Sequence, residues 1–195
     1  MKLYTKRGDQ GNTNLIGGRT VRKDDKRVAA YGTLDELNSL VGYIISQCSE
    51  EEKEIVDELV ELQHYLFDCG TDLADIKGKL PRKITDEQIS WLEKRIDGYA
   101  EEAPTIESFI LPGGDPVAAL IQMARTVTRR AEREIVSLQN EQEINTAVFV
   151  FINRLSDYFF ALARVINHRK GVTEPIYERG GKVFHNEEKQ RKSAE

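Results

Sequence analysis

The stretch from Val148 to Ile166, VFVFINRLSDYFFALARVI, decides the fold. Its large apolar residues return every three or four positions, which is the spacing of one face of a helix. The pattern predicts an amphipathic helix over about 144–169 whose apolar face is buried against other helices. The residues expected to point inward are Val148, Phe151, Leu155, Tyr158, Phe159, Leu162 and Ile166.

The same apolar period appears in four earlier segments of the chain. We expect helices over about 25–47, 51–77, 85–101 and 115–139, joined by short loops. No segment shows the apolar alternation of a strand over five or more residues, and no internal repeat is visible. The sequence therefore predicts an all-α protein, a five-helix up-and-down bundle.

The length of 195 residues suits a single domain with one core. Within it we expect three parts. Residues 1–24 form a polar segment ahead of the bundle, residues 25–170 form the helices, and residues 171–195 form a partly flexible polar tail.

Composition argues against several classes of protein. A net charge of −5 disfavours nucleic-acid binding. Cys48 and Cys69 lack CxxC spacing and are expected to be buried or half-buried thiols, which favours a reducing compartment. None of the histidines, His64, His168 and His185, pairs visibly with a nucleophile or a metal ligand. With no signal peptide and no run long enough to span a membrane, we expect a cytoplasmic protein.

The segment from Tyr4 to Leu15, YTKRGDQGNTNL, is rich in Gly, Asp, Asn and Thr and has no apolar period. Such a segment offers many backbone N–H groups together with hydroxyls and lysines. It can wrap an anion, above all a polyphosphate. Because it does not resemble a packed element, we expect it to be either disordered or functional.

Three expected helices carry narrow polar stripes away from their apolar faces. A solvated outer surface is the plainest interpretation of each stripe. The stripes are, however, short of lysine and hold the residue types that make directional hydrogen bonds to phosphate, ribose or metal. Four arginines within nine residues also suit a polyphosphate better than a nucleic acid, because no aromatic residues are interleaved. The stripes comprise Tyr31, Asp35 and Asn38; Arg125, Arg129 and Glu132; and Asn153, Asp157 and Arg164.

Three blocks of sequence, in this order and at these separations, resemble the PduO-type ATP:cob(I)alamin adenosyltransferases. The similarity extends from about residue 3 to residue 167. The first block holds YTKRGDQG from Tyr4, KDD from Lys23 and YGTLDELN from Tyr31; the second holds FILPGG from Phe109 and ARTVTRRAER from Ala124; the third is NRLSDY from Asn153.

The resemblance implies a homotrimer with active sites between adjacent subunits. It implies transfer of the 5′-deoxyadenosyl group of ATP to the cobalt of cobalamin, with magnesium present and triphosphate released. A four-coordinate Co(II) form would be reduced to the Co(I) nucleophile, so the protein itself would need no nucleophilic side chain. A cobalamin reductase and an adenosylcobalamin-dependent acceptor enzyme are implied as partners, with no nucleic acid and no membrane.

The resemblance also implies roles for individual residues. Phe109 matches the aromatic residue that displaces the lower axial ligand of cobalamin, although a hydrophobic staple onto the next helix is an alternative for it. Asp35 and Arg125 match residues that form a salt bridge between subunits near the corrinoid. Catalytic roles are implied for these three and for Arg129, Arg130 and Glu132. Nucleotide contacts are implied for Thr5, Lys6, Arg7, Gly8, Thr13, Asn14, Lys23, Arg129, Arg130, Ala131, Glu132, Arg133 and Asn153, with Glu132 near magnesium.

Two positions depart from the family pattern, and one pair matches it weakly. Arg7 stands where the family usually has Thr, and Asn14 where a small residue is common. Val183 and Phe184 are an adjacent apolar pair in the polar tail that could close over the corrin. Two other functions stay open at this point: an ATP- or corrinoid-binding delivery or regulatory module, and a structural helical oligomer.

Overall fold

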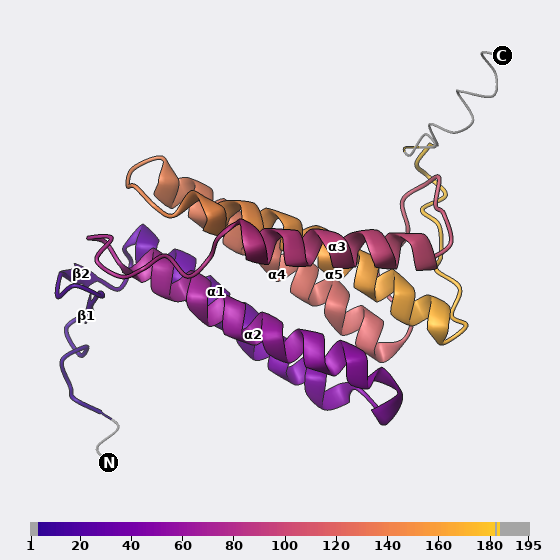
Figure 1. The fold of residues 1–195 in the computed structure, drawn as a ribbon, viewed down its shortest axis with the longest axis horizontal. Helices are drawn as coiled ribbons and strands as arrows, with labels where there is room; N and C mark the ends of the chain where they lie inside the picture. The colour runs from indigo at the N-terminus through magenta and orange to yellow at the C-terminus, as the bar shows by residue number, and fades with distance from the viewer. Residues whose placement is uncertain (1–3, 182, 184–195) are drawn as a thin grey trace.

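The computed structural model describes residues 4–181 and 183. Five α-helices run along one elongated bundle (Figure 1). The all-α, five-helix prediction is confirmed, and each helix end lies within three residues of its expected position. The helices are α1 (Lys26–Gln47), α2 (Lys53–Ala74), α3 (Asp86–Glu102), α4 (Pro116–Gln139) and α5 (Thr146–Arg169), with a short 3-10 turn, η1 (Glu50–Glu52), ahead of α2.

Side-chain caps set where four of the helices begin. At each N-cap, a side-chain oxygen accepts the backbone N–H two residues further on, so a helix-end donor is not left unpaired. Thr85 also forms a capping box with Gln88 at the start of α3. The capping residues are Asp25, Thr85, Asp115 and Asn145.

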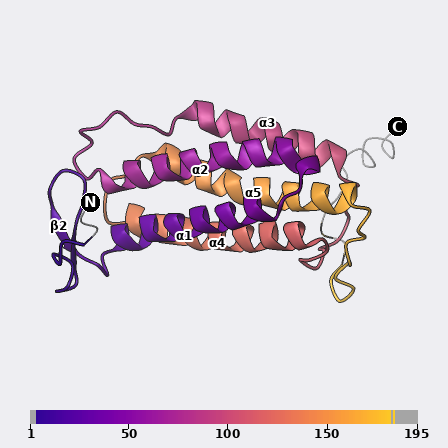
Figure 2. The same cartoon turned by 90° about the horizontal axis from the view of Figure 1, so that it is seen from below.

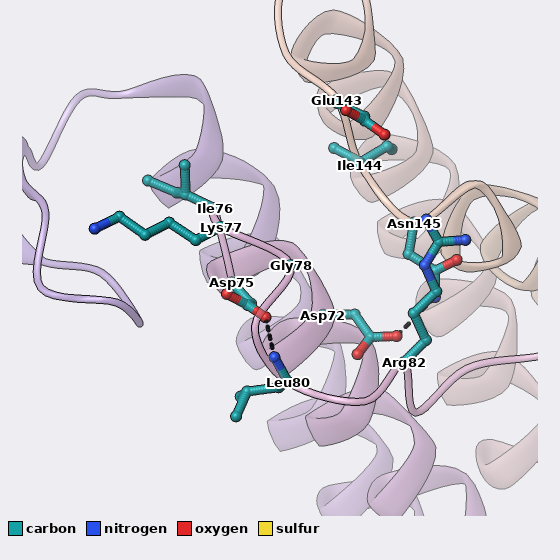
Figure 3. A pocket seen from close by; sticks show the side chains of 10 residues that line it. All are labelled: Asp72, Asp75, Ile76, Lys77, Gly78, Leu80, Arg82, Glu143, Ile144 and Asn145. Atoms are coloured by element: carbon teal, nitrogen blue, oxygen red, sulfur yellow. Dashed lines mark hydrogen bonds between the residues drawn. The ribbon is translucent and has the colours of Figure 1, made fainter.

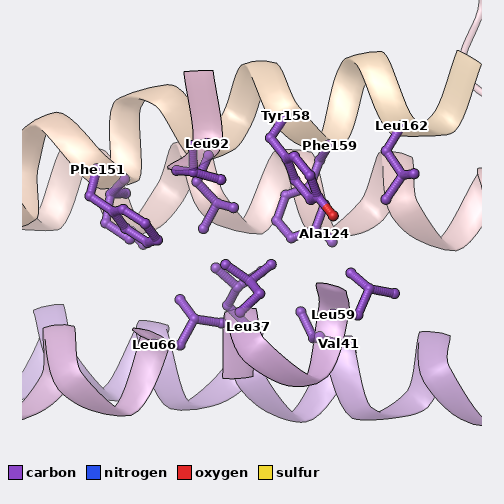
Figure 4. Close-up of a cluster of buried hydrophobic side chains, with 14 of the residues drawn as sticks. Leu37, Val41, Leu59, Leu66, Leu92, Ala124, Phe151, Tyr158, Phe159 and Leu162 are labelled. Atoms are coloured by element: carbon purple, nitrogen blue, oxygen red, sulfur yellow. The ribbon is translucent and has the colours of Figure 1, made fainter. Parts of the chain in front are cut away.

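The core lies between the helices along the whole bundle. α5 packs against α4 and α3, and α1 packs against α4 and α2. Figure 4 shows Leu37 and Leu66 facing Phe151 and Phe159 across this core. All seven α5 residues that were expected to point inward are buried, each at 1% exposure or less. α5 is the one described helix that is long and apolar enough to cross a membrane, and its apolar residues line this core.

A half-buried carboxylate joins three helices beside the core. Glu58 on α2 accepts hydrogen bonds from the hydroxyls of Tyr99 at 2.8 Å and Tyr158 at 3.2 Å. Its other oxygen lies 3.1 Å from the Arg95 guanidinium on α3. Burial and then the Glu58 charge raise the pKa of Tyr99. Tyr99 therefore stays protonated, as a hydrogen-bond donor to that carboxylate.

The N-terminal segment holds a small hairpin that the sequence did not predict. Strands β1 (Asn12–Asn14) and β2 (Thr20–Arg22) pair antiparallel, with Thr13 opposite Val21. Strands of three mostly polar residues are too short to show an apolar alternation, so a search for alternation over five or more residues did not find them. Leu15 is buried, and a bridge from Ile16 to Asp75 joins the hairpin to the end of α2. Figures 1 and 2 both place the hairpin at one end of the bundle.

Two residues assigned to outward polar stripes are instead buried. Asn38 is 6% exposed, and its Nδ2 donates to the Gln63 carbonyl on α2 at 3.2 Å. Arg164 is 8% exposed and forms an ion pair with Glu174 at 3.1 Å. The assignment of Asn38 and Arg164 to outward-facing polar stripes was therefore wrong. The angular position of a residue on one helix does not reveal which neighbouring segment covers it.

Arg27 ties together the end of the bundle that carries the hairpin. Its side chain is 2% exposed, and its guanidinium donates to the Leu73 carbonyl at the end of α2. It also donates to Gln142 Oε1 at 3.0 Å and to the Glu143 carbonyl at 3.3 Å, both in the α4–α5 loop. Burial lowers the pKa of Arg27, because no water remains to solvate the charge. One side chain therefore links α1, α2 and the α4–α5 loop.

We predict that Arg27→Ala destabilises the fold by about 3 kcal/mol, because buried carbonyl oxygens lose their donor. Urea unfolding followed by circular dichroism measures this loss. Arg22→Ala is the matched control, since Arg22 makes only an exposed ion pair with Asp24 and should cost less than about 1 kcal/mol. Equal stability losses for the two variants would contradict the central role of Arg27.

Candidate functional site

A cavity of about 300 Å³ opens between α4 and α5, next to the loop that precedes α4. Arg125 and Arg129 project from α4, and Asp157 and Phe160 from α5, because each pair is spaced by one turn or less. Phe109 from the α3–α4 loop lines the same cavity and is 52% exposed. The cavity thus combines apolar aromatic walls with two guanidinium groups.

The two arginines bring positive charge to this cavity, and the carboxylate of Asp157 lies on its wall as well. Arg125 is half-buried, and its Nε donates to Gln122 Oε1 at 2.7 Å. Burial and then the neighbouring Arg129 charge lower the pKa of Arg125. Within the described part of the chain, neither guanidinium lies within ion-pair distance of a carboxylate. Such an arrangement attracts an anion with several oxygen atoms.

The remaining arginines of α4 are held differently. Arg130 forms an ion pair with Glu36 on α1. Arg133 is exposed, and its Nη1 donates to the Arg129 carbonyl at 2.9 Å. Glu132 is half-buried on the same helix. Ala131 is fully buried in the core, so its side chain is not available to a ligand and we leave it out of the site.

Asn153 lies on the face of α5 that leads to the cavity. It stands three and four residues before Ser156 and Asp157, and its carbonyl accepts a hydrogen bond from Ser156 Oγ at 3.1 Å. Sequence reasoning missed Ser156 and Phe160, and on α4 it missed Gln122. All three stand at helical spacing from residues that it did select, so an extended stripe could have found them.

The Phe109 loop is fixed by the C-terminal segment of the described chain. The Tyr177 N–H donates to the Phe109 carbonyl at 2.7 Å, and the Leu111 N–H donates to the Pro175 carbonyl at 2.8 Å. The Val183 N–H donates to the Glu107 carbonyl at 2.9 Å. Val183 therefore lies beside this loop, whereas Phe184 falls outside the described residues.

The predicted nucleotide segment forms a compact turn structure at the hairpin end. The Gly11 N–H donates to the Gly8 carbonyl at 3.1 Å, and the Lys23 N–H donates to the Gly11 carbonyl at 2.8 Å. A Cβ on Gly8 would lie 3.1 Å from Lys23 Nζ, so the ammonium group sits directly over this glycine. The turn thus brings Lys23 and several backbone amides to one place.

Other residues of this segment keep the turn in shape. Lys6 has a positive φ of 61°, an uncommon conformation for a residue with a side chain, and such strain often marks a functional segment. The Arg7 N–H lies 3.5 Å from Thr5 Oγ1. In the hairpin, Asn14 Oδ1 accepts from the Thr20 hydroxyl at 2.8 Å beside Thr13.

Asp35 lies in a separate groove of about 320 Å³ between α1 and α2, lined also by Tyr31, Asn38 and Phe67. This groove and the α4–α5 cavity share no lining residue. Asp35 and Arg125 form no ion pair within the described residues of one chain. The expected salt bridge between subunits therefore stays a prediction.

A third hollow, of about 200 Å³, lies at the hairpin end (Figure 3). Its carboxylates serve the loops around it. Asp72 Oδ2 accepts from Asn145 Nδ2 at 2.7 Å and from the Ile84 N–H at 3.1 Å. Asp75 Oδ2 accepts a hydrogen bond from the Leu80 N–H at 2.8 Å, and this bond closes a turn. Helix α2 ends ahead of that turn, at Ala74 rather than at the expected residue 77. This hollow is a structural junction.

The N-terminal turn and Phe109 lie at opposite ends of one chain. The hairpin segment lies beside the C-terminal end of α4, where Lys26 pairs with Glu141. Phe109 lies beside the N-terminal end of the same helix. The 24 residues of α4 span about 36 Å at the usual rise per residue, and the predicted arginines of α4 lie along the helix between these two ends.

Comparisons with known proteins identify the class to which this architecture belongs. A model of the family described as cobalamin adenosyltransferase matches residues 3–166. A corrinoid adenosyltransferase of Bacillus subtilis is 52% identical over 186 residues, covering 94% of this chain and 96% of the relative. The human corrinoid adenosyltransferase MMAB is 37% identical, covering 90% of this chain and 73% of the relative.

Solved structures agree with these relatives. A variant PduO-type ATP:corrinoid adenosyltransferase from Lactobacillus reuteri, complexed with cobalamin and ATP, is 47% identical with a TM-score of 0.91. That match covers 94% of this chain and all of the other. The chain belongs to the cobalamin adenosyltransferase family. Its activity is that of a corrinoid adenosyltransferase, as the resemblance in sequence had implied.

We predict that Gly114→Ala distorts the Phe109 loop. Gly114 has a φ of 107°, and an added Cβ would lie 2.2 Å from Asn167 Oδ1, so the loop must move. The variant should lose roughly 1–3 kcal/mol of stability in thermal or urea unfolding. Gly98→Ala on the exposed face of α3 is the control, and should be neutral or stabilising by up to about 1 kcal/mol. A neutral Gly114→Ala would contradict the close contact.

Proposed function

We propose that this protein joins the 5′-deoxyadenosyl group of ATP to cobalamin in a site shared by two adjacent subunits of a homotrimer. The C5′–O5′ bond of ATP breaks, a cobalt–carbon bond forms with the electron pair of Co(I), and triphosphate leaves. The observation that carries this proposal is the α4–α5 cavity. There, two guanidinium groups without carboxylate partners stand beside an exposed Phe109.

Charge on the departing triphosphate is the main demand that this reaction makes on the protein. Co(I) is the nucleophile, so the side chains need to position both substrates and stabilise negative charge. Arg129 and Arg133 are exposed on α4 and are free of carboxylate partners in the described chain. Arg130 is paired with Glu36, and its nucleotide role requires that this exposed pair open or be shared.

We assign the N-terminal turn to the polyphosphate. The Lys23 ammonium stands over Gly8, whose lack of a side chain leaves room for the ammonium. Thr5, Lys6 and Arg7 lie in the same exposed segment. Backbone amides in a tight turn, together with a lysine, form a recurring anion-binding arrangement.

The corrinoid is assigned to the side of the cavity that Phe109 lines. A half-exposed aromatic ring beside a cavity keeps water and other ligands away from the face that it covers. Exclusion of the lower axial ligand would leave a four-coordinate Co(II) form, which is easier to reduce. Phe160 adds a second apolar wall from α5.

Two features of the single chain support a shared site. The N-terminal turn and Phe109 lie at opposite ends of α4, and Asp35 and Arg125 face different hollows. A neighbouring subunit can supply the missing half, and a ring of three chains closes this head-to-tail contact. The Asp35–Arg125 salt bridge would then form between subunits.

Magnesium fits this site only as a companion of the nucleotide. Within residues 4–181 and 183, no three His, Cys, Asp or Glu side chains gather as a metal site. Mg²⁺ commonly uses one or two carboxylates together with substrate phosphates, and Glu132 is the carboxylate nearest in sequence to the proposed triphosphate arginines. We place the protein in the cytoplasm, served by a cobalamin reductase and delivering to an adenosylcobalamin-dependent enzyme.

We predict that the protein converts ATP and chemically reduced cobalamin to adenosylcobalamin under anaerobic conditions with Mg²⁺, followed by absorbance. Arg129→Ala should lower kcat on the order of 10²-fold or more, because charge on the leaving triphosphate loses its partner. Arg169→Ala, which removes an exposed ion pair with Glu102, is the control and should keep normal turnover. No product with the unmodified protein would refute the proposed reaction.

We predict that two impaired variants restore activity when they are combined. Lys23→Ala damages the hairpin half of the site, and Arg129→Ala damages the cavity half. Co-expression in equal amounts should give about one quarter of the normal activity, because one site in four joins two intact halves from different chains. If both halves came from the same chain, no intact site could form, and the mixture would stay as inactive as its parts.

A further inference from the structure

Two buried polar residues, one turn apart on α5, sit beneath the loop that carries Phe109. Arg164 is 8% exposed and Asn167 is 1% exposed. Neither lines the cavity that holds Arg125 and Arg129. Buried polar groups at such positions are costly unless each hydrogen-bonding atom finds a partner, so their contacts reveal what they hold.

Glu174, just beyond the end of α5, bridges these two residues. Its Oε2 accepts from Arg164 Nε at 3.1 Å, and its Oε1 accepts from Asn167 Nδ2 at 3.3 Å. The Glu174 side chain is only 14% exposed. One carboxylate therefore satisfies two donors from α5 in a site largely shielded from water, where charged hydrogen bonds are strong.

The same two residues hold both ends of the Phe109 loop. Arg164 Nη2 donates to the Pro104 carbonyl, at the start of the loop. Asn167 Nδ2 donates to the Gly113 carbonyl at 3.0 Å, and its Oδ1 accepts the Asp115 N–H at 2.9 Å, at the end of the loop. The loop is thus anchored at its two ends by residues that Glu174 orients.

The segment that follows Glu174 also fixes the middle of the loop. Pro175 and Tyr177 pair with Leu111 and Phe109 through backbone hydrogen bonds of 2.8 and 2.7 Å. The position of the Glu174 side chain therefore affects both the ends of the loop and the backbone of Phe109.

We propose that Glu174 is a positioning residue for Phe109. Its carboxylate, held by Arg164 and Asn167, fixes the aromatic ring at the angle and depth at which it covers the lower face of the corrinoid. This inference rests on the proposed function of Phe109. Glu174 touches neither substrate in this assignment and acts only through the loop.

Glu174→Gln is the sharpest variant, because it keeps the size of the side chain and changes only its chemistry. An amide offers one acceptor oxygen and one NH₂ donor. One of the two donors that Glu174 now satisfies, on Arg164 or on Asn167, would then face another donor. Glu178→Gln is the matched control, since Glu178 carries the same charge in the same segment and is exposed.

The substrate pair that separates positioning from general damage is cobalamin and cobinamide. Cobinamide lacks the lower nucleotide base and carries only a weakly held water there, so its adenosylation depends less on a ring that excludes the lower ligand. When the assay starts from Co(II)alamin with a reductant, so that the four-coordinate form must arise on the protein, we expect kcat of Glu174→Gln with cobalamin to fall about 10- to 100-fold, as a displacement on the order of 1 Å can cause. With cobinamide, kcat should stay within about twofold, and KM for ATP should be unchanged with both corrinoids.

A spectroscopic readout accompanies the kinetics. With ATP bound, the fraction of Co(II)alamin in its four-coordinate form should fall in Glu174→Gln and stay normal in Glu178→Gln. Thermal unfolding of both variants checks that the bundle is intact, and Glu174→Asp, which keeps the charge, should recover part of the cobalamin rate.

Equal losses of rate with cobalamin and cobinamide would overturn the positioning role, and so would an unchanged four-coordinate fraction. An unmodified protein that turns over neither corrinoid would instead refute the proposed function itself. The two failures are therefore distinguishable in the same set of assays.

Discussion

The length of the bundle is the constraint on which the rest of this molecule depends. α4 spans about 36 Å, and rigid helices packed on a continuous core hold the N-terminal turn at one end of the bundle and the Phe109 loop at the other. Arg125 and Arg129, which line the Phe109 cavity, lie along α4 between these two ends. Under the proposed function, association with further copies is the route by which the N-terminal turn meets that cavity.

Buried polar groups stabilise the fold of this protein, whereas exposed charged groups form its candidate site. Arg27 and Asn167 are buried and Glu58 is half-buried, and the hydrogen bonds that they donate or accept join segments far apart in sequence. Arg125 and Arg129, in contrast, face a cavity without a carboxylate partner in the described chain. Satisfied groups stabilise one arrangement of the backbone, whereas the unsatisfied charges are available to a ligand.

The sequence predicted most of the fold and a large part of the site. The helix starts were predictable because caps such as Thr85 and Asp115 act locally. Strands β1 and β2 were missed, because their pairing depends on a partner strand rather than on an apolar pattern. Asn38 and Arg164 were misplaced for a similar reason: the segments that bury them, α2 and the chain after α5, are invisible to a helical wheel.

The sequence by itself determined the five helices, the arginine-rich face of α4 and the family, because periodicity and motifs are local properties of the chain. Only the tertiary structure decided which of these residues share a cavity and which lie at opposite ends. It also showed that Glu174 reaches back to Arg164 and Asn167 to anchor the Phe109 loop. Contacts between distant segments depend on how helices pack and cross. The sequence was therefore enough to predict an anion-binding role for the turn-rich N-terminal stretch. Only the fold showed that this stretch lies far from Phe109.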